Sequence, residues 1–347
     1  MSEETKQPAP RRVLSGMRPT GKLHLGNYMG ALKNWVELQN ATEASGAPKY
    51  ECYFFIADYH ALTTDYADTS GLKENVRDVA LDFLSAGLDP KRCTIFVQSD
   101  VPAHAELSLL LGMITPLSWL ERVPSYKDQQ EQLKEKDLGT FGFLGYPLLM
   151  SADILVYQAE FVPVGQDQAA HVEITREIAR RFNNFYSGDD QEILPEPQTL
   201  LTPSPKLPGT DGRKMSKSYG NTILLSDPEP EVRAKLKTMV TDPARIRRSD
   251  AGDPDVCPVF DLHKVFSTGE TQAEVRAGCT SAGIGCIQCK GWLADAVVKE
   301  LAPIQQRRQH FEAHPEEVKA ILDDGAVRAN ERAEQTMQQV RAAVGLE

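Results

Sequence analysis

The sequence predicts an α/β protein, with a parallel β-sheet in the first two thirds of the chain and an α-helical region after it. Short apolar runs of strand length alternate with amphipathic helical stretches up to about residue 182, as in parallel sheets with crossover helices. From Glu229 onward strands disappear and the periodic segments are helical. No internal repeat interrupts this division. We therefore expect a disordered tail over 1–12, an α/β domain over 13–226 and a helical domain over 227–347.

The first strand and the first helix flank a turn near the N-terminus. Val13 and Leu14 have the apolar character of a strand end, and the Gly, Pro and Thr that follow break the strand. From Asn27 the apolar residues fall on one helical face. Further elements are expected over Cys52–Ala57 (strand), Leu72–Ala86 (helix, closed by Gly87) and Thr94–Gln98 (strand).

The middle of the chain mixes polar and apolar segments. Gln129–Asp137 is polar enough for a solvated helix or loop, whereas Phe143–Tyr157 is strongly apolar around one carboxylate, Asp153. A fourth strand is expected over Phe161–Val164, with a helix from Gly165 to about Phe182. Leu194–Pro208 contains five prolines, which predicts a loop. The last third has predicted helices over Glu229–Val240, Trp292–Phe311, Glu316–Leu322 and Ala326–Val344.

Composition and charge are those of an ordinary globular protein. Of the 347 residues, 41% are hydrophobic and 25% are charged. The apolar run Leu107–Met113 is too short to cross a membrane, and the polar stretch Met1–Arg12 lacks the apolar core of a signal peptide. We therefore expect a soluble protein of the cytoplasm. The net charge of −11 argues against general nucleic-acid binding.

A specific nucleic-acid partner is still compatible with this charge, because local patches matter more than the total. Such clusters more often form solvated helix faces than phosphate contacts. The candidate patches are Lys235 with Lys237, Arg245 with Arg247 and Arg248, and Arg307 with Arg308.

The segment His24-Leu25-Gly26-Asn27 lies between the first strand and the first helix. A helix N-terminus offers free N–H groups and the positive end of a dipole, which suit an anionic ligand. His24 and Asn27 can donate hydrogen bonds to phosphate oxygens, and Gly26 has no Cβ to keep a nucleotide from the backbone. Alone, the segment equally fits a capped helix that carries a surface histidine.

The second motif, Lys214-Met215-Ser216-Lys217-Ser218, lies far downstream in a glycine-flanked loop. Alone, it fits a flexible lysine-rich surface loop. Together, the two segments resemble the HIGH and KMSKS motifs of class I aminoacyl-tRNA synthetases. From about Val13 to the C-terminus, the chain resembles the bacterial tryptophanyl-tRNA synthetases. Their fold is a Rossmann-like catalytic domain followed by a helical anticodon-recognition domain, so the resemblance implies the same here.

The resemblance implies a reaction in which the tryptophan carboxylate attacks the α-phosphorus of ATP, and the adenylate is then captured by tRNA(Trp). Such a reaction needs positioning and charge neutralisation rather than an enzyme nucleophile. The implied catalytic residues are His24, Asn27, Lys214 and Lys217. Implied ATP contacts are Arg18, Gly26, Asn27, Gly165, Asp167, Gln168, Lys214, Met215, Ser216 and Lys217. Mg²⁺ as cofactor and a homodimer are also implied.

The resemblance places tryptophan around Asp153, whose matching residue in the family accepts the indole N–H. From the residues alone, a buried Asp in an apolar segment must be paired. The other implied tryptophan contacts are Leu14, His60, Tyr146, Met150, Val162 and Val164. For the apolar residues among them, core packing is an equally good explanation.

Three positions depart from the family pattern. Leu14 stands where the family's tryptophanyl enzymes carry Phe and its tyrosyl enzymes carry Tyr, so it cannot partner a substrate hydroxyl. Arg18 replaces an expected Gln, and Gln166 an expected acidic residue. Two other functions stay open beside the ligase, and Leu14 and Arg18 give weight to the second of them. One is a metabolite adenylyltransferase with a HIGH-type fold, and the other is a paralogue that binds tryptophan, ATP or RNA with weak or no charging activity.

Four of the six cysteines form a separate pattern. Cys257, Cys279, Cys286 and Cys289 are separated by 21, six and two residues, whereas Cys52 and Cys93 lie in apolar strands and fit inert core thiols. In a cytoplasmic protein this spacing predicts a metal site rather than disulfides. Four thiolates suit Zn²⁺ or an iron–sulfur cluster. A subset of the resembling enzymes carries a [4Fe-4S] cluster on a similar pattern, which favours iron–sulfur over zinc.

Overall fold

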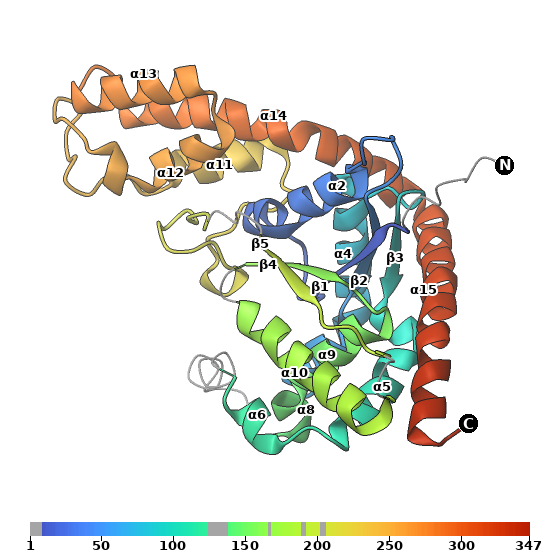
Figure 1. Cartoon of the computed structure of the whole chain (residues 1–347). Helices are drawn as coiled ribbons and strands as arrows, with labels where there is room; N and C mark the ends of the chain where they lie inside the picture. The colour runs from blue at the N-terminus through green and yellow to red at the C-terminus, as the bar shows by residue number, and fades with distance from the viewer. Residues whose placement is uncertain (1–8, 124–137, 166–167, 189–191, 202–205) are drawn as a thin grey trace.

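The computed structural model describes residues 9–123, 138–165, 168–188, 192–201 and 206–347. Within them, five parallel strands form one sheet in the order β3-β2-β1-β4-β5 (Figure 1). The strands are β1 (Arg11–Met17), β2 (Tyr50–Ile56), β3 (Cys93–Val97), β4 (Phe161–Val164) and β5 (Gln198–Leu201). The predicted parallel α/β fold is therefore confirmed.

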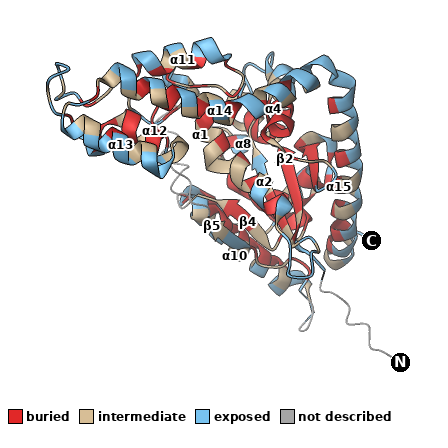
Figure 2. Cartoon of the chain, turned by 90° about the horizontal axis from the view of Figure 1, so that it is seen from above, coloured by how far each residue is buried: buried red, intermediate tan, exposed pale blue. Residues whose placement is uncertain are grey.

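β2 and β3 are buried along almost their whole length because helices cover both faces of the sheet there. Every residue of β3 is buried, and in β2 only Glu51 is not. Figure 2 shows β2 mostly in the red of buried residues. β1 pairs with β2 on one side and with β4 on the other. The chain therefore changes direction across the sheet at β1, and ligands of such sheets bind beyond the strand ends at this point.

Two sheet boundaries differ from the sequence-based expectation. β1 begins at Arg11, so Arg11 and Arg12 belong to the sheet and not to a tail over 1–12, because β2 offers them pairing partners at Tyr50 and Glu51. β5 lies inside Leu194–Pro208, which we expected to be only a loop. It is an edge strand with mostly exposed side chains, so it lacks the apolar run that identifies a buried strand.

The helices before residue 187 pack around the sheet. Predicted and observed bounds coincide for α4 (Leu72–Ala86), which ends at Gly87 with a φ of 113°. The polar segment Gln129–Asp137 lies outside the described residues. The other helices here are α1 (Leu25–Asn27), α2 (Lys33–Asn40), α3 (Asp58–Asp65), α5 (Ala103–Gly112), α6 (Leu117–Glu121), α8 (Phe141–Leu144), α9 (Tyr146–Val156) and α10 (Ala169–Tyr186).

The last third is helical, as expected, but its two longest helices are longer than predicted. α11 (Glu229–Thr238), α12 (Pro258–Phe266) and α13 (Gly269–Thr280) pack at one end of α14 (Cys286–Ala313), which runs back to the sheet (Figure 1). α15 (Pro315–Val344) is one helix, where two were expected with a break near Gly325. A Cβ at Gly325 would lie 1.8 Å from the carbonyl oxygen of Ile95, so this glycine permits close packing on β3.

No helix in the described part of the chain is both long enough and apolar enough to span a membrane.

Candidate active site

The turn after β1 places His24 at the start of α1. The ring Nδ1 accepts a hydrogen bond from the backbone N–H of Asn27 (3.3 Å), and the N–H of His24 donates to Asn27 Oδ1 (3.1 Å). Because Nδ1 is the acceptor, a neutral ring carries its proton on Nε2. The Asn27 amide keeps its Nδ2 donor. Both side chains therefore retain an N–H for an anionic ligand.

The structure explains the glycine at position 26 without reference to a ligand. A Cβ at this position would come within 2.9 Å of the His24 ring, with Met215 Cβ at 3.8 Å. Only glycine leaves the ring free to cap α1 in this orientation. Gly26 therefore stabilises the observed orientation of His24, with or without a bound nucleotide.

The two motifs meet in the structure. The backbone of Leu25 donates to the carbonyl of Ile223 (2.9 Å), and Leu225 donates to the carbonyl of Leu23 (2.9 Å), which joins the turn to the segment after the lysine loop. Lys217 Nζ donates to the carbonyl of Gly21 (2.7 Å) and to that of Thr20 (3.1 Å). The cation of the second motif therefore rests on the turn of the first.

Burial and neighbouring charge set the protonation of both groups. Burial, then the charges of Lys217 and Lys214, lower the pKa of His24 to about 4. Burial also lowers the pKa of Lys217 to about 8, against the opposite effect of Asp82 and Asp78. At pH 7 the site thus pairs a neutral imidazole with a cationic lysine, which together suit a polyphosphate.

The titration of His24 predicts acid sensitivity of the fold. The folded pKa of about 4 lies below the ordinary value of 6.5, so between these values the unfolded chain binds a proton that the folded chain does not. The free energy of unfolding should therefore decrease as the pH falls from 6.5 toward 4. Urea denaturation at pH 7 and pH 5 measures this, and His24→Asn should shrink the difference. An unchanged difference in His24→Asn would mean that this ring titrates normally in the folded protein.

Asp82 on α4 is a functional residue that the sequence analysis missed. Its carboxylate is fully buried, and its Oδ2 accepts the backbone N–H of Leu23 (2.7 Å), directly before His24. Its Oδ1 accepts from Arg308 on α14, which also bonds Asp78 (3.0 Å) and Glu312 (2.7 Å). The only available signal was one carboxylate within the buried run Val79–Ala86. Arg308 on α14 therefore stabilises, through Asp82, the turn that leads to His24.

Asp153 is paired on both oxygens, as its burial required. Oδ2 lies 2.8 Å from His60 Nε2, and Oδ1 lies 2.7 Å from both Gln98 Nε2 and His104 Nδ1. Burial opposes ionisation, but His60 and His104 outweigh it and hold the pKa of Asp153 at about 2. His104 in turn bonds the Tyr157 hydroxyl (2.9 Å). Asp153 is therefore a fixed, ionised acceptor at neutral pH.

The sequence analysis found His60 but missed Gln98 and His104. Gln98 directly follows the buried strand β3, and ligands of parallel sheets bind beyond the carboxyl ends of the strands. Its Oε1 is buried and has no partner among the described residues. The predicted apolar contacts lie in the same layer: Leu14 and Val162 are buried in the core cluster that surrounds this site, and Met150 and Val164 are half-buried against it. Tyr146 is buried and its hydroxyl lies 3.2 Å from His171 Nε2.

The remaining predicted ATP contacts are only partly described. Gly165 and Gln168 lie between β4 and α10, joined by a hydrogen bond from the Gln168 N–H to the Gly165 carbonyl (3.0 Å), whereas Asp167 and Gln166 lie outside the described residues. Arg18 turns toward α3, where Nη2 bonds Thr64 and lies 3.4 Å from Asp65 Oδ2. Lys214 is exposed and Met215 is buried. The Ser216 hydroxyl lies 2.9 Å from Ser218 Oγ, and the Ser216 N–H donates to Asn221 Oδ1 (2.8 Å).

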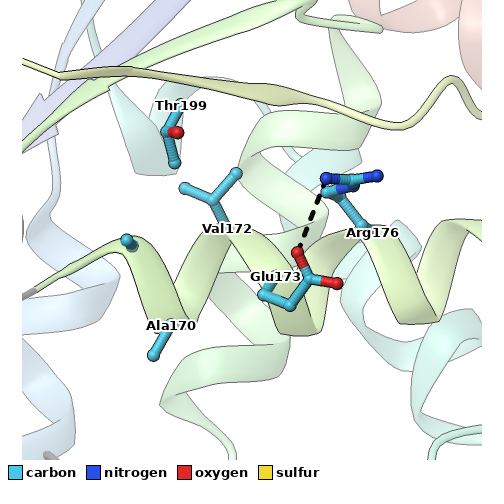
Figure 3. Close-up of a pocket in the computed structure, with 6 residues that line it drawn as sticks. Ala170, Val172, Glu173, Arg176 and Thr199 are labelled. Carbon is cyan, nitrogen blue, oxygen red and sulfur yellow. Dashed lines mark ion pairs between the residues drawn. The ribbon is translucent and has the colours of Figure 1, made fainter.

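A cavity of about 330 Å³ lies beside α10 and is lined in part by Val172, Arg176 and Thr199. Figure 3 shows Glu173 and Arg176 joined across its wall by an ion pair of 3.5 Å. None of the predicted site residues within the described part of the chain lines it. We therefore place the candidate site at the two motifs and Asp153, not in this cavity.

The four spaced cysteines converge although they come from three helices. Cys257 precedes α12, Cys279 lies in α13, and Cys286 and Cys289 lie in the first turn of α14. Burial, then the other three thiols, raise the pKa of Cys289 to about 12. No three of their sulfurs lie mutually within 4.8 Å, a spacing met among the described residues only by the exposed set His310, His314 and Glu317. Cys52 and Cys93 are buried opposite each other in β2 and β3.

The predicted basic patches are largely used within the fold. Arg308 is committed to Asp82, and Arg307 donates to the Ser85 carbonyl (2.6 Å). Lys235 pairs with Asp227 (2.6 Å), and Arg245 donates to the Ile284 carbonyl (2.6 Å). Arg307 and Arg308 are therefore not available as a surface patch, because α14 packs them against α4.

Comparisons with known proteins show what the chain is similar to. The family model described as tRNA synthetases class I (W and Y) matches residues 6–302. A tryptophan–tRNA ligase of Thermotoga maritima is 52% identical, covering 96% of this chain and 99% of the relative, and one of Ralstonia nicotianae is 47% identical, covering 97% and 99%. The crystal structure of a tryptophanyl-tRNA synthetase from Campylobacter jejuni, complexed with ADP and tryptophan, superposes with a TM-score of 0.84 at 36% identity and covers 96% of this chain and 99% of that one.

Proposed function

Because the chain belongs to the class I tRNA synthetases that act on tryptophan and tyrosine, we propose how its own residues carry out the reaction. The activity is the ATP-dependent ligation of L-tryptophan to tRNA(Trp). The observation that carries the site assignment is the contact of Lys217 Nζ with the Gly21 carbonyl, which brings the two motifs to one place. Because a ligase of this kind acts where tRNA is, we propose the cytoplasm as its compartment.

In the first step, a tryptophan carboxylate oxygen forms a bond to the α-phosphorus of ATP as the bond to the β-phosphate oxygen breaks and pyrophosphate leaves. His24 Nε2–H and Asn27 Nδ2 would donate to the phosphates from one side, and Lys214 and Lys217 would neutralise the leaving phosphates from the other. Mg²⁺, when bound to the phosphates, would neutralise further charge. In the second step, a terminal ribose hydroxyl of tRNA attacks the activated carbonyl and AMP leaves.

One pair of assays tests the assignment. Tryptophan-dependent exchange of pyrophosphate into ATP reports the first step, and charging of tRNA(Trp) reports both. We expect both activities. Exchange without charging, or neither, would favour the alternative of a paralogue that binds tryptophan, ATP or RNA. This alternative draws on Leu14 and Arg18, but the meeting of Lys217 with the first turn favours the active enzyme.

Asp153 is proposed to accept the indole N–H of tryptophan. The other residues proposed to contact tryptophan are Leu14, His60, Tyr146, Met150, Val162 and Val164. Two donors occupy Oδ1 and one occupies Oδ2, so Oδ2 has the spare lone pair for the substrate. Gly165, Asp167 and Gln168 are proposed to contact the ribose, by resemblance. Arg18, Met215 and Ser216 are proposed to contact ATP elsewhere, also by resemblance.

Asp153→Ala should weaken tryptophan binding by about 1–3 kcal/mol, because the indole N–H would become a buried, unpaired donor. ATP binding should change less. Calorimetry with each ligand measures both. His104→Ala is the matched control, since it removes a support of Asp153 but leaves the acceptor, and it should cost less tryptophan affinity. Equal losses for the two ligands would mean that Asp153 only supports the fold.

We propose that Cys257, Cys279, Cys286 and Cys289 hold a [4Fe-4S] cluster, with Zn²⁺ as the alternative. The preference for iron over zinc rests on the cysteine spacing, which is similar to that of the resembling enzymes that carry such a cluster. Arg245, 3.7 Å from Cys279 Sγ, would favour an anionic thiolate set. The cluster would supply a fixed cross-link among α12, α13 and α14.

Cys286→Ser should weaken tRNA charging and largely spare tryptophan-dependent pyrophosphate exchange, because the cysteines lie far from His24 in sequence and belong to the helical region proposed to meet the anticodon. Protein purified without oxygen should be brown with about four irons per chain, and the variant should lose most of this iron. Cys52→Ser, which changes a core thiol, should keep both the iron and the charging activity. Colourless protein with one zinc would favour the alternative metal, and normal charging without any metal would contradict the proposal.

A helical domain from residue 227 is proposed to meet the anticodon, with Arg247 and Arg248 as exposed cations near the four cysteines. A homodimer is proposed from exposed apolar side chains on α5, α6 and α8, at the lower end of Figure 1. These are Leu109, Met113, Leu117 and Phe141. Sedimentation equilibrium would distinguish a dimer from a monomer.

A further inference from the structure

A second charged cleft lies at the amino ends of β1, β2 and β3, opposite the strand ends that lead to His24. Its volume is about 470 Å³, and α15 supplies one wall. Its lining includes the second residues of β1 and β2, Arg12 and Glu51, and the first residue of β3, Cys93. The cleft is therefore separated from the two motifs by the length of the sheet, and no role assigned above uses it.

Positive charge dominates this cleft. Its five cations are Arg12, Lys91, Arg92, Arg328 and Arg332, against the carboxylates of Glu51 and Glu331. Two of the cations are already paired, Arg92 with Asp89 (3.8 Å) and Arg328 with Asp324 (2.9 Å). The other three have no carboxylate within 4 Å in the described part of the chain. Glu51 accepts the Tyr53 hydroxyl instead (2.7 Å).

Arg12 and Arg332 are held side by side by one residue, Gln158. Arg12 Nε donates to the Gln158 carbonyl (3.2 Å), and Arg332 Nη2 donates to Gln158 Oε1 (2.5 Å). Arg332 Nη1 donates to Gln335 Oε1 (2.9 Å), and Arg332 Nε is buried without a hydrogen-bond partner. Both terminal nitrogens of Arg12 lack a partner among the described residues. Burial, then the charge of Arg12, lower the pKa of Arg332. Two neighbouring guanidinium groups thus keep unused donors in a cleft.

We propose that this cleft binds a phosphate group between Arg12 and Arg332. A guanidinium matches phosphate oxygens with paired N–H donors, and a dianion between two of them removes their mutual repulsion. The volume admits a small free anion such as pyrophosphate or a phosphate monoester, and the open side also admits a phosphate of an RNA backbone. Phosphate is the shared chemistry, and the experiment separates its two sources.

The test is calorimetric titration of pyrophosphate into the full chain, compared with Arg12→Gln/Arg332→Gln. The unmodified chain should bind at two sites, the active site and the cleft. The double variant should weaken the second by at least about tenfold, because charge-assisted hydrogen bonds are lost, while its rate of pyrophosphate–ATP exchange stays unchanged. Arg92→Gln is the matched control: it removes a cation of the same cleft that is already paired, and it should keep both sites.

A parallel tRNA-binding titration identifies the source of the phosphate. Weaker tRNA binding with unchanged pyrophosphate binding would assign the phosphate to RNA. If neither ligand binds more weakly in the double variant, the proposal is overturned. Gln158 has a φ of 48° and accepts a hydrogen bond from each arginine, so its position depends on both. A lower thermal midpoint of the double variant would show that its fold is disturbed. Arg332→Lys then replaces it: it keeps the charge but loses the paired donors, so it should keep the midpoint and still weaken phosphate binding.

Discussion

Lys217→Ala is expected to reduce tryptophan-dependent pyrophosphate exchange on the order of a hundredfold, as for the loss of one preorganised electrostatic group. Lys217 Nζ lies on the carbonyls of Thr20 and Gly21, at the edge of the turn that ends in His24. From this position its charge can reach the leaving phosphates as negative charge develops on them. The loss should appear mainly in kcat, with tryptophan affinity nearly unchanged.

Lys22→Ala provides the matched control, since it removes an exposed lysine from the same turn. The pH dependence gives a second readout. With a pKa of about 8, free Lys217 loses its charge as the pH rises through 8, so kcat/KM for ATP should fall above that pH. The fall should be absent in Lys217→Ala. Exchange kinetics that are the same in Lys217→Ala and Lys22→Ala would remove Lys217 from the mechanism.

Local sequence signals predicted the parts of the fold that local physics determines. The apolar stripe of α4 and its closing Gly87 fix both ends of that helix without help from the rest of the chain. β5 and the continuity of α15 depend instead on distant partners. β5 forms because β4 offers an open edge, and Gly325 stays helical because β3 lies directly against it. A glycine chosen for close packing and a glycine that ends a helix look the same in one sequence.

The same division holds for the site. Each motif is short and contiguous, so His24, Asn27 and Lys217 could be identified from their neighbours. The residues that orient them come from other elements: Gln98 reaches Asp153 from the turn after β3 and His104 from α5, and Asp82 reaches the turn from α4. Nothing in the spacing of these residues along the chain reveals such pairs, because the sheet order and the helix packing create them.

The pair of Asp82 and Arg308 leads to the largest expected effect on stability. Arg308→Ala should lower the free energy of unfolding by about 3–5 kcal/mol, because it leaves a buried carboxylate without its cation. Asp82 is fully buried, and the Arg308 side chain is only 4% exposed. Asp78 would lose the same partner. Urea denaturation measures the loss. Arg307→Ala is the control: Arg307 donates one hydrogen bond to the Ser85 carbonyl, so its loss should lower the free energy of unfolding by only about 1 kcal/mol.

The same variant should also affect ATP use, because Asp82 holds the Leu23 N–H directly before His24. Without Arg308, the carboxylate would shift or take up a proton, and the turn that presents His24 and Asn27 would lose its fixed position. KM for ATP in the exchange assay should therefore rise, with KM for tryptophan nearly unchanged, since the Asp153 network has no bond to Asp82. Asp82→Asn should raise KM for ATP less, because its amide oxygen can still accept the Leu23 N–H. Should both Michaelis constants rise together in Arg308→Ala, the pair would support the whole domain and not specifically the ATP turn.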